Sequence, residues 1–159
     1  MKYLILAAVL MTGCSGANTP GVSSSPSSGG PTGISVSAAD LAMCVNDLNG
    51  YRASVHLPAL ARSSALDAYA AQGAQIDGSS NAAHAHFAST NGGGVARVEN
   101  ELLNQNYGSV QAAIRALDSI SWAEGPSGGH YRNMTGTYTQ VGCGAFVQNG
   151  AITVVQDFH

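Results

Sequence analysis

The amino-acid sequence predicts an α+β fold, a three-layer α/β/α sandwich with a central antiparallel sheet. Two strand-like runs at the C-terminus, 139–147 and 151–158, are separated by Gln148-Asn149-Gly150. Asn-Gly between two apolar runs is a strong local signal for a β-hairpin. Three earlier segments carry apolar residues at helical spacing, and helices of this kind bury their apolar faces against another layer.

The three helical segments can be bounded from their caps and breaks. The first, over 37–57, begins with a Ser three residues before an Asp, which is a capping-box pattern, and it ends before Pro58. The second is expected over 64–75, and its alanines suit close packing against another layer. The third, over 109–122, begins at a Ser cap and presents apolar residues on one face.

A further strand is expected between the second and third helices, because residues 95–99 alternate between apolar and polar. Segments 77–81, 91–94 and 125–129 are rich in Gly, Asn and Ser, and we expect them to be loops. The two-histidine segment 83–87 follows the first of these loops. Its histidines are therefore expected near a loop or a short helical turn.

The beginning of the chain is expected to lie outside the folded domain. Residues 1–13 join a basic start to a short apolar run, the pattern of a lipoprotein-type signal peptide, and Cys14 would then be the lipidated residue. Cleavage by an ordinary signal peptidase, and a buried strand in place of a signal, are the alternatives. Residues 14–33 are rich in Ser, Gly and Pro and are predicted to be a disordered tether. We expect residues 34–159 to form one domain, exported and either lipid-anchored in the bacterial cell envelope or secreted.

Charge and cysteine content narrow the possible functions. Only 9% of the residues are charged, the net charge is −3, and no basic run occurs, so binding of nucleic acid is disfavoured. Cys44 and Cys143 are the two cysteines of the expected domain, and in an exported chain they suggest one disulfide bond. A first helix that covers the Cys143 face of the hairpin would let Cys44 reach it. Two free buried thiols are the alternative.

Four ionisable residues occur in short, distinctive frames: His84, Glu99, Glu124 and His130. Side chains of these types, if they converge, make a polar cleft that can hold a divalent cation or move a proton. Two neutral imidazoles suit Zn²⁺ or a similar ion, and the carboxylates can orient the rings or hold a bound water. No serine lies in a nucleophile-elbow frame. A hydrolase that uses these residues would therefore need a metal-assisted or water-based mechanism.

The ordered set of motifs resembles the CAP superfamily, whose domains are also called SCP domains. That group includes cysteine-rich secretory proteins, insect venom allergens, plant pathogenesis-related proteins and small bacterial secreted domains. The motifs that carry the resemblance lie at 46–52, 98–100, 122–124, 129–134, 141–144 and 155–158. The resemblance implies a cleft formed by His130, Glu99, Glu124 and one of His84 or His86, with His84 favoured. Glu124 departs from the family pattern, because it follows the tryptophan by two residues instead of three.

The sequence therefore predicts an exported, lipid-anchored CAP-type binding module whose His/Glu cleft could hold Zn²⁺ or another divalent cation. Its expected partners are a membrane, reached through the lipid on Cys14, and a small hydrophobic or lipid ligand, which the resemblance implies from some family members. A metal- or water-assisted hydrolase built on the same four residues is the alternative. A structural envelope protein with a vestigial cleft is the third interpretation.

Overall fold

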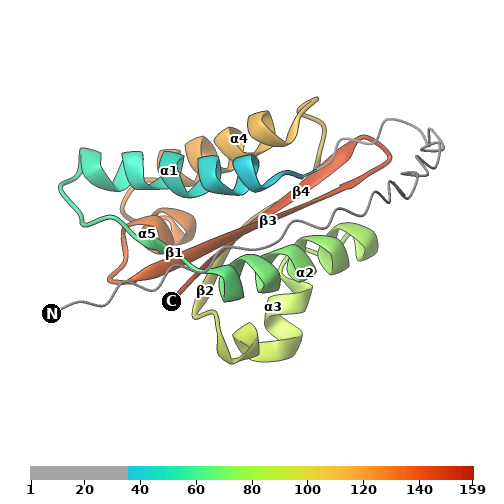
Figure 1. The fold of residues 1–159 in the computed structure, drawn as a ribbon, viewed down its shortest axis with the longest axis horizontal. Coiled ribbons are helices and arrows are strands. Elements are labelled where there is room, and N and C mark those ends of the chain that lie inside the picture. The colour runs from blue at the N-terminus through green and yellow to red at the C-terminus, as the bar shows by residue number, and fades with distance from the viewer. Residues whose placement is uncertain (1–35) are drawn as a thin grey trace, which may run out of the picture. The chain divides into compact units, whose positions relative to one another are not determined.

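The computed structural model describes residues 36–159, and within them helices lie on both sides of one four-stranded sheet (Figure 1). This arrangement confirms the predicted α+β sandwich. The predicted signal peptide, the lipidation at Cys14 and the tether all lie outside the described residues. Among the helices that the structure describes, none combines the length and the apolar character needed to cross a bilayer.

The described chain contains helices and strands, and it ends in a β-hairpin. The helices are α1 (Ala38–Ser54), α2 (Ser64–Ser80), α3 (Ala85–Thr90), α4 (Val110–Ala123) and α5 (Gly129–Thr135), with a 3-10 turn, η1, at Asn91–Gly94. The strands are β1 (Ala61–Arg62), β2 (Val98–Gln105), β3 (Gln140–Gln148) and β4 (Ala151–Phe158), in the order β1-β3-β4-β2. Strand β4 is antiparallel to both neighbours, whereas β1 is parallel to β3. The sheet is therefore mixed and not wholly antiparallel, because the short link between α1 and α2 pairs with the start of β3.

The two faces of the sheet are covered by different helices. Helices α1 and α4 lie over one face, and α2 and α3 lie over the other (Figure 1). Side chains alternate along β4, as they do along any strand. Ile152, Val154 and Phe158 therefore belong to the main core beneath α1 and α4, while Val155 packs with Ala70 and other residues of α2.

The tripeptide Gly142–Cys143–Gly144 of β3 joins all three layers. Cys143 points toward α1 and forms the predicted disulfide bond with Cys44. On the opposite face, a Cβ atom at either glycine would clash with the backbone of α2, at Leu66 and Asp67 or at Ala70 and Ala71. Only glycine allows α2 to lie this close to the strand. The alternative of two free thiols is excluded.

The structure also corrects several predicted boundaries. Helix α2 continues past Gln75 to Ser80, so the loop predicted over 77–81 is wrong. Asn81, in the left-handed conformation with φ of 54°, ends the helix. The strand predicted over 95–99 begins only at Val98 and extends to Gln105. Helix α5 was not predicted, because glycine and polar residues dominate its sequence and hide any apolar face.

We expect Gly144→Ala to lower the free energy of unfolding by about 1–3 kcal/mol, since the added methyl group must push α2 away from the sheet. Gly50→Ala is the matched control, because a Cβ atom there meets nothing within 4 Å. Alanine favours the helical conformation, so this control should gain up to about 1 kcal/mol. Urea unfolding of both variants measures the difference. Equal midpoints would contradict the close-approach argument.

Candidate functional site

His84 is held by two glutamates of strand β2. Its ring Nδ1 lies 2.7 Å from Oε1 of Glu99, and its backbone N–H donates to Oε2 of Glu101 at 2.5 Å. The backbone φ of His84 is 58°, which is uncommon for residues other than glycine and is a strained conformation. The hydrogen bond that the His84 backbone N–H donates to Glu101 supports this conformation, and the contact with Glu99 orients the imidazole.

His130 is held in the same manner by Glu124. The glutamate follows the last residue of α4, and its two carboxylate oxygens accept from the backbone N–H of His130 at 2.9 Å and contact its Nδ1 at 2.5 Å. The hydrogen bonds from His130 lower the pKa of Glu124. Gly128 makes this contact possible, because a side chain there would collide with that of Glu124.

The rings of His84 and His130 are stacked near β2, which is a strand at the edge of the sheet. Their centroids lie 6.3 Å apart, and their planes differ by 25°. Each ring has its Nδ1 against a carboxylate, so a neutral ring that donates from Nδ1 carries its lone pair on Nε2. A carboxylate that orients a histidine through one nitrogen while the other nitrogen binds a metal is a common arrangement in metal sites.

Two asparagines fix the position of α5, and with it the position of His130. Nδ2 of Asn133 donates to the backbone carbonyl of Glu99 at 3.0 Å and to Oδ1 of Asn100 at 2.9 Å. Nδ2 of Asn100 in turn donates to the carbonyl of His130 at 3.3 Å. The strand that carries Glu99 is thus tied directly to the helix that carries the second histidine.

Four of the predicted residues are therefore brought together as two histidine–glutamate pairs: His84, Glu99, Glu124 and His130. His86, the predicted alternative to His84, lies elsewhere. It is buried, its ring packs on Tyr69 with centroids 4.7 Å apart, and its backbone N–H donates to Asp77 at 2.8 Å. These contacts place it in the interior, against α2.

Glu101 belongs to the site but was not predicted. His84, Glu99 and Glu101 form a group that could hold a metal ion, since one ligand atom of each lies within 4.8 Å of the others. Burial raises the pKa of Glu101 to about 7. The signal in the sequence was the period-two spacing of the two glutamates, which places both side chains on the same face of β2.

Further acidic residues lie buried beneath the cleft. Asp157 of β4 is paired directly with Glu99 of β2, and the carboxylates of both are buried. Burial, together with the charges of Glu99, Asp77 and Glu101, raises the pKa of Asp157 to about 8. Within residues 36–159, oxygens of all four acids and Nε2 of His86 are buried without a hydrogen-bond partner. This concentration of unsatisfied acceptors makes the interior below His84 favourable for a proton or a cation.

Comparisons with known proteins agree with this arrangement. The model of the cysteine-rich secretory protein family, CAP, matches residues 45–158, which include every residue of the two histidine–glutamate pairs. None of the curated proteins compared with the chain matches it.

Without a metal, the protein should become less stable as the pH rises from about 5 to about 9. The pKa values of Glu101 and Asp118 are raised to about 7 and that of Asp157 to about 8, chiefly by burial. Hydrogen bonding to Glu99 raises the pKa of His84, which acts in the same direction. A raised pKa means that the folded state binds more protons than the unfolded state across this window, so the free energy of unfolding falls with pH.

Urea unfolding in the presence of a chelator, at several pH values, tests this expectation. Asp157→Asn should reduce the slope, because its amide does not ionise. A midpoint that rises with pH would show that these carboxyl groups are not protonated in the folded protein.

Proposed function

Because the chain belongs to the cysteine-rich secretory protein (CAP) family, we propose that it is an exported binding module whose His/Glu cleft holds a divalent cation. The observation that carries the proposal is the orientation of the two rings. Nδ1 of His84 and of His130 each face a glutamate, and the rings lie 6.3 Å apart. Imidazole nitrogen together with carboxylate oxygen suits Zn²⁺ and several other divalent ions.

Two sets of atoms compete for the ion. In the first set, Nε2 of His84 and Nε2 of His130 are the ligands, while Glu99 and Glu124 orient the rings. In the second set, His84, Glu99 and Glu101 supply the ligands. We favour the first set, because Oε2 of Glu101 already accepts the backbone N–H of His84, and its carboxyl pKa of about 7 leaves it partly protonated at neutral pH.

Binding is favoured over covalent catalysis by the hydrogen bonds of the two histidines. Across the described residues, no Ser, Thr or Cys side chain bonds to either ring. Nucleophilic catalysis needs such a contact between the base and the nucleophile. The predicted alternative, a metal- or water-assisted hydrolase, would depend on the same histidines and glutamates, so the variants below also apply to it.

We expect the purified protein to bind Zn²⁺ in calorimetry and His84→Ala to abolish binding, because both ligand sets use this residue. His130→Ala should weaken binding at least about tenfold, as expected for loss of a ligand, whereas Glu101→Gln should change it by less than about threefold. The opposite ranking of these two variants would reject the two-histidine arrangement. An unchanged affinity in His84→Ala would reject the cleft as the metal site.

The membrane anchor is proposed from the sequence alone, with the disulfide bond and the family as consistent support for export. Two or more acyl chains on Cys14 would give stable membrane attachment. Metabolic labelling with a fatty-acid analogue should mark the wild-type chain and the control Ser15→Ala, but not Cys14→Ser. Label that persists in Cys14→Ser would refute the anchor.

A further inference from the structure

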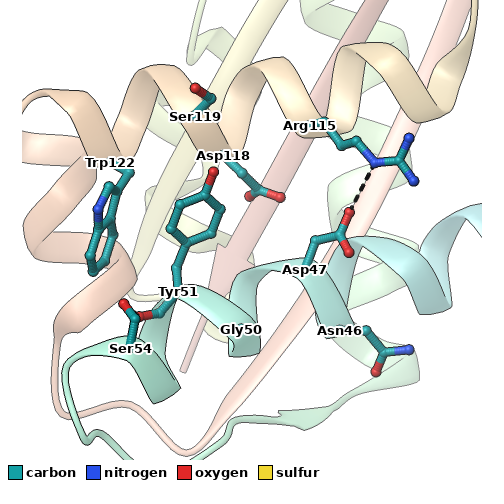
Figure 2. A pocket seen from close by; sticks show the side chains of 9 residues that line it. All are labelled: Asn46, Asp47, Gly50, Tyr51, Ser54, Arg115, Asp118, Ser119 and Trp122. Atoms are coloured by element: carbon teal, nitrogen blue, oxygen red, sulfur yellow. Dashed lines mark hydrogen bonds and ion pairs between the residues drawn. The ribbon is translucent and has the colours of Figure 1, made fainter.

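A cavity of about 660 Å³ lies between α1 and α4 (Figure 2). It is on the face of the sheet opposite α2 and the buried residue Asp157. Neither cleft histidine lines it. Its walls combine two aromatic rings, two carboxylates, one guanidinium and several small polar groups. The lining includes Asp47, Gly50, Tyr51, Arg115, Asp118 and Trp122. A volume of this size is typical of sites for small organic ligands.

Asp118 is the unusual residue of this cavity. Its side chain is only 1% exposed, and Oδ1 accepts from Nε2 of Gln156 at 2.7 Å. Its Oδ2 has no hydrogen-bond partner in the part of the chain that the structure describes, and neither do Oε1 of Gln156 or Oγ of Ser121. A buried carboxylate with one oxygen left without a donor is unfavourable, and burial together with the nearby Asp47 raises the pKa of Asp118 to about 7.

The aromatic walls lie beside this carboxylate. Figure 2 shows the ring of Tyr51 of α1 between Trp122 and Asp118. The two rings are in contact, with centroids 5.0 Å apart. Aromatic faces attract cations through their quadrupoles, and they also bury aliphatic chains. A site that joins an unpaired carboxylate to aromatic rings is complementary to an ammonium group that carries an apolar tail.

The charges of the lining favour the same kind of ligand. The guanidinium of Arg115 lies 3.5 Å from Asp47 at the open side of the cavity, and the Arg115 side chain is largely exposed. Asp47 therefore has a cation nearby, whereas Asp118 pairs with no cationic side chain of residues 36–159. An anionic ligand would have to lie beside both carboxylates, with Arg115 already engaged.

We propose that the cavity between α1 and α4 binds a small organic cation, a primary ammonium with a short apolar tail. The ammonium donates to Oδ2 of Asp118, and the tail lies against Tyr51 and Trp122. This site is separate from the His/Glu cleft and requires no metal. It therefore goes beyond the proposed function and does not depend on it.

The fluorescence of Trp122 can test the proposal, because the chain contains one tryptophan and that residue lines the cavity. The purified full chain is titrated with n-hexylammonium, 1-hexanol and hexanoate at pH 8 and constant ionic strength. We expect a saturable change with n-hexylammonium, binding of 1-hexanol at least about tenfold weaker, and none with hexanoate. Hexanol or hexanoate binding as tightly as n-hexylammonium, or no saturable change at all, overturns the proposal.

Three variants complete the test. Asp118→Asn keeps its shape and its acceptor oxygen but removes the charge, so the affinity for n-hexylammonium should fall at least about tenfold. Asp67→Asn is the matched control and should change the affinity less than about threefold, because Asp67 belongs to α2 on the other face of the sheet and does not line the cavity. Gly50→Leu should obstruct the cavity, because Gly50 lines it and an added Cβ atom there meets nothing within 4 Å. Full affinity in both Asp118→Asn and Gly50→Leu would place the ligand elsewhere and overturn the assignment.

Discussion

The close approach of helix α2 to strand β3 sets the geometry on which the rest of the molecule depends. Gly142 and Gly144 admit the backbone of α2 directly onto the strand, while the residue between them, Cys143, is bonded to α1 on the other face. One tripeptide thus fixes both outer layers. Because Asp77, near the end of α2, accepts the backbone N–H of His86, the height of α2 above the sheet also determines where α3 begins. The position of His84, one residue before α3, follows from that contact.

The cleft concentrates unfavourable features that the surrounding fold must offset. His84 has a strained backbone, Glu99 and Asp157 are directly opposite each other on neighbouring strands, and several buried oxygens have no partner within the described chain. Like charges placed across strands are destabilising, and unpaired buried acceptors add to the cost. Strain and unsatisfied polar groups of this kind concentrate at functional sites. A cation bound near His84 would relieve part of the repulsion.

Local signals in the sequence were sufficient for the elements, but not for the way in which they meet. The capping box at Ser37 and the hairpin at Asn149 are properties of a few adjacent residues, and both are present in the structure. The four residues of the cleft stood out because charged residues make up only 9% of this chain. Glu101 and Asp157 did not stand out, because each looks like the exposed position of an alternating strand. Only the packing of α2 and α3 over that face buries them, and this packing is a tertiary effect.

Strand β4 separates two polar interiors of the fold. Gln156 faces α1 and α4, where it donates to Asp118, and its neighbour Asp157 faces the acids beneath His84. Each side contains buried acceptors without partners within residues 36–159. Helix α5 borders both regions, because Tyr131 packs on Trp122 with centroids 4.7 Å apart while the preceding residue, His130, faces the cleft. Through these two neighbouring residues, α5 is in contact both with the wall of the cavity between α1 and α4 and with the histidine pair.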